Sequence, residues 1–292
     1  MRTPSDVSRQ DAANQAYHQP PSRATICIAL ADASCQPLQD PALLDTADRQ
    51  RCARSPWLAT RPDWRASRFL KQCHQPVADT PDSRSLSHSR GHAALAIRSP
   101  AGIIGVDLEK IRVRNFVALL PQFATDDEVQ WWQAQAQPAE AFHRLWTIKE
   151  ALLKASGLDF PGDLRRVGLR HDPDSRRWQL HVAPSSVPPG PGERNPGRRA
   201  SGTSQATMSC TKDMYASAPA ARAGTISPGD AGDAQGGFSR SDVTDGTRHW
   251  QGVSAVLNGQ WLLACVWLAA GERPALRWEP HGNWRIENVV YF

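Results

Sequence analysis

The stretch Leu145-Trp146-Thr147-Ile148-Lys149-Glu150-Ala151-Leu152-Leu153-Lys154-Ala155-Ser156-Gly157 guides the interpretation of the whole sequence. Good helix formers fill it, Pro138 opens it upstream, and Gly157 stands where a helix would end. Its apolar residues recur at three- and four-residue steps, which predicts a helix with one buried face. Glu150 and Lys154 lie one turn apart on a shared face. Taken alone, this pair is typical of a solvated helical ion pair.

A second stretch, Gly105-Val106-Asp107-Leu108-Glu109, has the alternation of a β-strand. The aliphatic side chains point to one face, and Asp107 and Glu109 both point to the other. Two neighbouring carboxylates repel each other unless a positive group lies between them. Oxygen ligands without nearby Cys or His favour a hard cation such as Mg²⁺, which takes further ligands from water and substrate phosphates. The alternative is an exposed edge strand with two solvated acids.

Together the two stretches resemble the 4′-phosphopantetheinyl transferase superfamily. Its members carry a G-[IV]-D-[IVL]-E strand and, about forty residues later, a W-[ST]-x-K-E-[AS]-x-x-K helix, matched here by residues 105–109 and 146–154. A third family element, N-[IL]-S-H-[ST], corresponds to Ser85-Leu86-Ser87-His88-Ser89, with Ser85 in place of the family's Asn. The resemblance covers roughly residues 60–180, with a return near 247–270.

The resemblance implies an α+β fold of two similar α/β halves, related by a pseudo-two-fold axis with the active cleft between them. We expect a disordered N-terminus at 1–22, an N-terminal half at 23–100, and a C-terminal half at 101–271. A low-complexity stretch at about 184–248 interrupts the second half, and a tail follows at 272–292. This layout resembles the monomeric two-half members related to surfactin-synthetase activators.

The implied reaction transfers the 4′-phosphopantetheine group of coenzyme A to a serine of an apo acyl or peptidyl carrier protein. It depends on Mg²⁺ and releases adenosine 3′,5′-bisphosphate. The resemblance assigns the metal to Asp107, Glu109 and Glu150, and catalysis to Glu150, Lys154 and Lys149. It assigns coenzyme A binding to Arg61, Arg65, Arg68, Ser87, His88 and Lys154.

Several of these residues have simpler explanations. The arginines at 61, 65 and 68 follow helical spacing and could form a solvated basic face. His88 could be a loop histidine bonded to backbone. Thr125 and Glu128 form a capping box, which explains the acids at 126–128 by local structure. Arg112 and Arg114 are expected at the surface or the rim of the site.

Composition restricts the partners and the compartment. The 292 residues carry a net charge of +5, yet no nucleic-acid module is recognisable, so the positive surface suits coenzyme A and an acidic carrier. The six cysteines lack metal or disulfide spacing, which indicates a cytoplasmic protein. No secretory signal is visible, and the longest apolar run, 261–270, is too short to span a membrane.

Two other functions stay open at this point. The chain could be a carrier-binding module that kept the fold but lost catalysis, because the long insertion could reshape the cleft. It could also be a different Mg²⁺-dependent phosphotransferase, although the sequence has no G-x-x-x-x-G-K-[ST] loop. Nothing in the sequence selects among carriers of fatty acid, polyketide and nonribosomal peptide assembly.

Overall fold

A computed structural model describes residues 23–77, 81–184, 249–269 and 271–292, and shows a mixed α/β fold. The predicted disordered N-terminus, and all of the predicted insertion except Pro184, lie outside these residues. Within the described ranges the strands form two four-stranded sheets, ordered β2-β3-β1-β9 and β10-β7-β8-β4, and a separate β5-β6 hairpin.

The strands are β1 (Thr25–Ala31), β2 (Ser83–Ser89), β3 (His92–Ser99), β4 (Ile104–Lys110), β5 (Val167–Asp172), β6 (Arg177–Val182), β7 (Trp250–Leu257), β8 (Trp261–Leu268), β9 (Ala275–His281) and β10 (Ile286–Tyr291). The α-helices are α2 (Thr46–Arg54), α3 (Pro62–Cys73), α4 (Phe116–Phe123), α5 (Asp126–Gln133) and α6 (Pro138–Ser156). Short 3₁₀ helices η1 to η4 cover Ala33–Leu38, Pro41–Leu43, Pro56–Thr60 and Leu164–Arg166.

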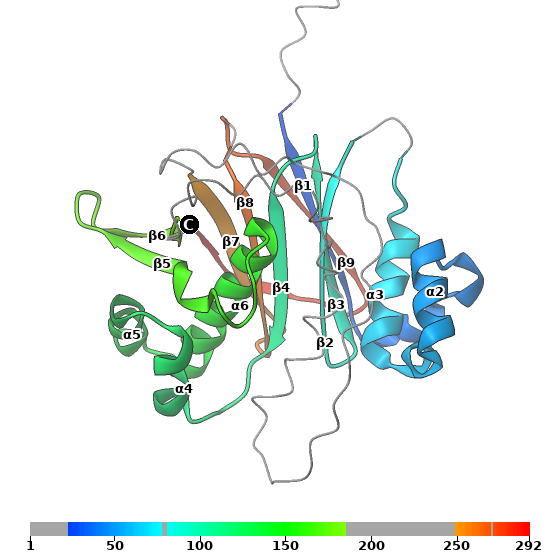
Figure 1. Ribbon diagram of the computed structural model, residues 1–292, viewed down its shortest axis with the longest axis horizontal. Helices are drawn as coiled ribbons and strands as arrows, with labels where there is room; N and C mark the ends of the chain where they lie inside the picture. The colour runs from blue at the N-terminus through cyan, green and yellow to red at the C-terminus, as the bar shows by residue number, and fades with distance from the viewer. Residues whose placement is uncertain (1–22, 78–80, 185–248, 270) are drawn as a thin grey trace, which may run out of the picture.

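The two large sheets face each other, and helices cover their outer faces (Figure 1). Strand alternation explains this layering, because odd and even residues of a strand enter different cores. In β1, Ile26, Ile28 and Leu30 pack between the sheets, whereas Ala29 and Ala31 pack toward α3. On the second sheet α6 occupies the position that α3 has on the first. The order of layers is thus helix, sheet, sheet, helix.

The predicted helix is confirmed over Pro138–Ser156. Gly157 ends it in the left-handed conformation at φ 63°, which glycine adopts without a steric penalty. The capping box of Thr125 and Glu128 is also present at the start of α5. Asn258 and Gly259, both with positive φ, make the tight turn between β7 and β8. The helix and the capping box therefore form where the sequence predicts them.

The segment 272–292 is not the separate tail that we expected. It supplies β9, which pairs in parallel with β1 in the first sheet, and β10, which pairs with β7 in the second. Leu276, Trp278, Trp284 and Ile286 are partly buried and pack against the core between the sheets. The C-terminal segment therefore completes both sheets, because its apolar residues need the inter-sheet core for burial.

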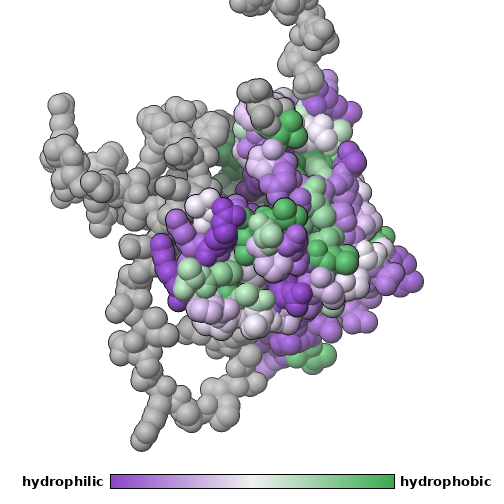
Figure 2. Space-filling view, turned by 90° about the vertical axis from the view of Figure 1, so that its right-hand side faces the viewer, coloured by the Kyte–Doolittle hydropathy of each residue, from purple (hydrophilic) through white to green (hydrophobic). Residues whose placement is uncertain are grey.

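Each large sheet has one long helix on its outer face, and the pseudo-two-fold relation between the halves stays a prediction. The face that carries α2 and α3 is largely hydrophilic, with separate apolar patches (Figure 2). In the described part of the chain, no helix combines the length and apolar character needed to cross a bilayer. The cysteines within the described ranges are unbridged thiols.

Candidate functional site

The acids of β4 lie at the outer edge of the second sheet, but they are not solvated. Asp107 is fully buried, and Glu109 is 9% exposed. Val106 and Leu108 fill the core between the sheets, so the intervening acids face the side of the sheet that α6 covers. The alternative of an exposed edge strand with two solvated carboxylates is therefore wrong.

Serines of β2 cover this edge of β4 from the neighbouring sheet. The backbone N–H of Val106 donates to Ser85 Oγ at 3.0 Å, and that of Leu108 donates to Ser87 Oγ at 3.2 Å. The Ser87 hydroxyl in turn donates to Asp107 Oδ1 at 2.8 Å. An edge strand needs partners for its outward N–H groups, and alternate serines provide them here without a continuous β-ladder.

One turn of α6 packs directly on β4. A Cβ atom added to Gly105 would lie 2.0 Å from the Ala151 carbonyl oxygen, so only glycine allows this close approach. At the same level Lys154 Nζ donates to the Val106 carbonyl at 3.0 Å and to Asp107 Oδ1 at 2.9 Å. Glu150, 1% exposed, lies one turn earlier on the helix. The structure thus pairs Lys154 with Asp107, which the sequence did not predict.

Lys149 is not part of this arrangement. Its ammonium group is completely buried, pairs with Glu128 at 2.8 Å and donates to the carbonyls of Leu164 and Val167. It joins α6 to α5 and β5, so its position gives no support to the predicted catalytic role. Glu128 has a second function beyond the capping box, since its Oε1 also accepts the Leu169 N–H.

A pocket adjoins Glu109 and is lined by residues of both halves. Arginines dominate its charge, with four of them against the acids Asp63 and Glu109. Its lining comprises Arg61, Asp63, His88, Ser89, Arg90, Glu109, Arg112, Arg114, Leu119, Gln122, Phe123, Phe142, His143 and Trp146. A pocket with this excess of guanidinium groups suits a polyanionic ligand such as a diphosphate.

The residues predicted to bind coenzyme A do not all lie at the pocket. Arg61 and His88 line the pocket, and Arg65 lies one turn further along α3, half-buried and outside that lining. Arg68 is buried, with Nε 2.7 Å from Asp48 Oδ2 and its guanidinium stacked on Trp64. This pair attaches α3 to α2, and it leaves Arg68 unsuited to bind a phosphate. The expected single basic face of α3 is therefore wrong.

Ser87 and Lys154 contact Asp107 and do not line the pocket. Conversely, the pocket contains Arg112 and Arg114, which the sequence analysis placed at the surface or rim. Their signal was their alternate spacing directly after the acidic strand, which puts both side chains on one side of an extended chain. The histidine at 143 was also missed, because it reads as one more residue of the α6 helix.

Burial, reinforced by Arg114 and Arg112, lowers the pKa of His143 below its ordinary 6.5. The Ala139 carbonyl and the nearby Glu109 act in the opposite direction without cancelling this shift. His143 Nδ1 lies 2.7 Å from the Ala139 carbonyl oxygen, so Nδ1 carries the proton of the neutral ring. The pocket wall beside Glu109 therefore holds an uncharged imidazole near pH 7.

Asp107, Glu109 and Glu150 are three buried carboxylates from one strand and the helix that covers it. This all-oxygen donor set suits Mg²⁺. The three acids are not among the described residues whose potential ligand atoms all lie within 4.8 Å of one another. That arrangement is formed by a different cluster, His74, Glu279 and His281. The structure thus brings the predicted acids to one region without gathering them into a closed ligand set.

Comparison with known proteins finds similarity in this region to one superfamily. Residues 103–186 match the model of the 4′-phosphopantetheinyl transferase superfamily. The chain is 29% identical over 122 residues to a protein of Haemophilus influenzae named putative 4′-phosphopantetheinyl transferase, covering 39% of this chain and 51% of that protein. It is 33% identical over 85 residues to a 4′-phosphopantetheinyl transferase of Aneurinibacillus migulanus, covering 28% of this chain and 35% of the relative.

A third relative, from Synechocystis and also named putative 4′-phosphopantetheinyl transferase, is 29% identical over 113 residues, which are 34% of this chain and 46% of the relative. The chain thus spans about half or less of the length of the curated relatives it matches. The matched segment contains β4, α6 and the contact between Lys154 and Asp107. Through this segment the chain is similar to the 4′-phosphopantetheinyl transferase superfamily.

Proposed function

We propose that this protein transfers the 4′-phosphopantetheine group of coenzyme A to a serine of an apo acyl or peptidyl carrier protein. The observation that carries the proposal is the position of the buried β4 acids. They lie within the superfamily segment, with Lys154 bonded to Asp107 and Glu109 lining an arginine-rich pocket. Coenzyme A carries a pyrophosphate and a 3′-phosphate, which match the charge of that pocket.

Asp107, Glu109 and Glu150 would hold Mg²⁺. When bound, the cation would neutralise negative charge on the pyrophosphate as the bond to the leaving group breaks. In the proposed step, the carrier serine oxygen forms a bond to the phosphorus next to the pantetheine arm. The bond from that phosphorus to the bridging oxygen breaks, and adenosine 3′,5′-bisphosphate leaves. Glu150 is our choice to accept the serine proton.

The chain's own cations have distinct proposed tasks. Lys154 keeps Asp107 in place through their 2.9 Å contact and adds positive charge close to the reacting phosphate. Arg61, His88, Arg112 and Arg114 bind and orient the phosphates of coenzyme A from the pocket wall. Two of these four come from the first half of the chain and two from the loop after β4, so substrate binding requires both halves.

The test is the intact mass of an apo carrier protein after incubation with the full chain, coenzyme A and Mg²⁺. A gain equal to one phosphopantetheine group, lost when a chelator removes Mg²⁺ and restored by adding it back, is the expected result. Glu150→Gln should abolish the gain, and Glu140→Gln, in the first turn of the same helix where it pairs with Arg144, should not. Carrier binding without any mass gain would favour a binding module that has lost catalysis. Phosphate transfer only between nucleotides would favour another Mg²⁺-dependent phosphotransferase.

A further inference from the structure

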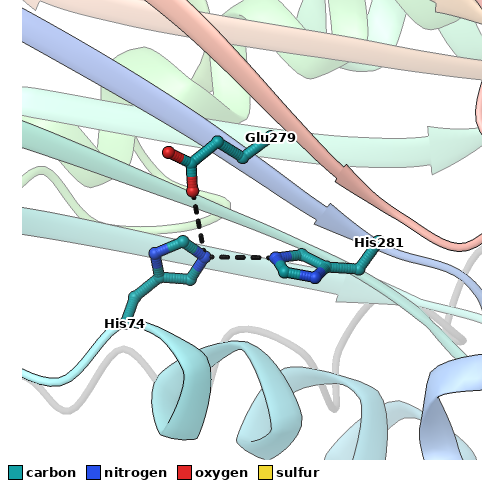
Figure 3. A group of neighbouring side chains, drawn as sticks. All are labelled: His74, Glu279 and His281. Carbon is teal, nitrogen blue, oxygen red and sulfur yellow. Dashed lines mark hydrogen bonds and ion pairs between the residues drawn. The ribbon is translucent and has the colours of Figure 1, made fainter.

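A second group of side chains, far from the β4 acids in sequence, meets where α3 ends. His74 caps the C-terminal end of α3, and Glu279 and His281 lie on β9 (Figure 3). His74 Nε2 lies 3.3 Å from His281 Nε2 and 3.6 Å from Glu279 Oε2. Figure 3 shows the Glu279 carboxylate and the His281 ring both directed at Nε2 of His74. These residues are separated by about two hundred positions, so only the tertiary fold brings them together.

The placement follows from strand alternation. Leu276 and Trp278 of β9 enter the core between the sheets, so Glu279 and His281 face the opposite side, toward α3. Phe69 of α3 packs edge-on against the His281 ring at a centroid distance of 5.4 Å and restricts its orientation. The Arg84 guanidinium donates to the backbone carbonyl of His74 and fixes the chain there. The three ligand candidates are therefore held by neighbours and partly shielded from solvent.

The separations of His74 Nε2 from His281 Nε2 and from Glu279 Oε2 fit a tetrahedral metal centre. Ligands at about 2.0–2.2 Å from Zn²⁺ lie roughly 3.3–3.6 Å from one another in a regular tetrahedron. Hydrogen bonding explains the cluster less completely, because a proton on His74 Nε2 can serve His281 but not a carboxylate oxygen 3.6 Å away. The three potential ligand atoms all lie within 4.8 Å of one another, so one cation placed between them could bind all three.

We propose that His74, Glu279 and His281 bind one divalent transition-metal ion, with Zn²⁺ the best match. Two imidazoles and one carboxylate suit zinc, whereas Mg²⁺ prefers oxygen ligands alone. The Cys27 thiol hydrogen-bonds Glu279 from β1 and orients that carboxylate. Arg277 also pairs with Glu279 through its other oxygen, which leaves Oε2 directed at the histidines.

The metal would have a structural role. β9 lies at the edge of the first sheet and is paired along one side with β1, although it belongs to the C-terminal segment. A bound ion would connect β9 to the end of α3. It would thereby hold a strand of the C-terminal segment in the N-terminal half. Because an ion that binds only the folded state stabilises it, the melting temperature should rise with zinc concentration.

The experiment uses the full chain, freed of metal with a chelator, in buffer with a thiol reductant and saturating Mg²⁺. Saturating Mg²⁺ competes for the β4 acids, and the site variants below assign the zinc that remains bound. Zn²⁺ is titrated by calorimetry against a competing chelator, and Co²⁺ is added as a spectroscopic probe of the unmodified protein. We expect one equivalent of Zn²⁺ with micromolar or tighter affinity, a higher melting temperature, and the intense visible absorption of tetrahedral Co²⁺.

The double variant His74→Ala/His281→Ala should weaken binding by more than about 100-fold, because loss of outer-shell partners alone typically costs about 10–100-fold. Glu279→Gln, which preserves size, should weaken it less and serves if the double variant fails to fold. His171→Ala, on the remote β5, is the matched control and should bind like the unmodified chain. Unchanged affinity in the double variant or in Glu279→Gln, or an octahedral Co²⁺ spectrum in the unmodified chain, would overturn the proposal.

Discussion

Lys154 Nζ lies 2.9 Å from Asp107 Oδ1, and neither side chain is more than 5% exposed. This ion pair connects α6 to β4 at the position where the sequence predicted a metal ligand and a catalytic lysine. We predict that Lys154→Met lowers phosphopantetheine transfer by about 100-fold or more, because it removes a preorganised positive charge beside the reacting phosphate. Turnover should be measured per folded molecule, with the folded fraction taken from circular dichroism. Transfer near that of the unmodified protein would remove Lys154 from the mechanism.

Lys149 should give the opposite pattern. Lys149→Met leaves the buried Glu128 carboxylate without its ammonium partner, which typically costs about 3–5 kcal/mol in the free energy of unfolding. Urea denaturation measures that loss, and we expect the turnover of the molecules that remain folded to be close to normal. A stable variant with greatly reduced turnover per folded molecule would contradict this structural role and would restore the catalytic one.

Two serines of β2 allow a matched test of how Asp107 is positioned. Ser87→Ala and Ser85→Ala each remove an acceptor for a backbone N–H of β4, at a cost of about 1–3 kcal/mol in unfolding free energy. Of the two hydroxyls, that of Ser87 also donates to Asp107. Transfer and its dependence on Mg²⁺ concentration should change in the Ser87 variant and stay near normal in the Ser85 variant. Equal effects on transfer would mean that the Asp107 contact does not matter.

Gly105 is predicted to be indispensable for a steric reason. Gly105→Ala places a methyl group against the Ala151 carbonyl and forces α6 away from β4, an overpacking that typically costs about 1–3 kcal/mol. Thermal melting should show the loss, and transfer should fall because Lys154 moves with the helix. Gly162→Ala is the control, since its added methyl group meets no atom within 4 Å. A Gly105 variant as stable as this control would show that the helix is free to shift.

The stability of the protein should decrease in mild acid, in part because of His143. The pKa of this histidine is lowered in the folded state, so unfolding takes up a proton below its ordinary 6.5. Its contribution is fully present above that pH and is lost as the pH falls toward the lower folded-state pKa. We expect His143→Gln to flatten the dependence of unfolding free energy on pH below pH 6.5. Urea titrations with a chelator present would show this, and an unchanged slope would contradict it.

The sequence by itself determined the helix and the strand of the candidate site and their similarity to the superfamily. Helical spacing, Pro138 and Gly157 defined α6, and alternation defined β4 with both acids on one face. These signals are local, because they depend on residues at most a few positions apart. The motif residues shared by β4 and α6 also sufficed to indicate the superfamily, since their chemistry is carried by residue type and spacing.

Only the tertiary structure decided which of the predicted cations serve the site. In the sequence, Lys149, Lys154 and Arg68 are equally plausible cations for the site. In the structure, Lys149 forms a buried ion pair with Glu128, and Arg68 forms one with Asp48. Which cations are paired in this way depends on acids from other helices, and no local sequence pattern predicts those pairs. The same holds for β9, whose pairing with β1 requires the inter-sheet core, and for the meeting of His74 with His281. Long-range packing determined these contacts, because the free energy of burying apolar surface depends on the whole fold and not on any single segment.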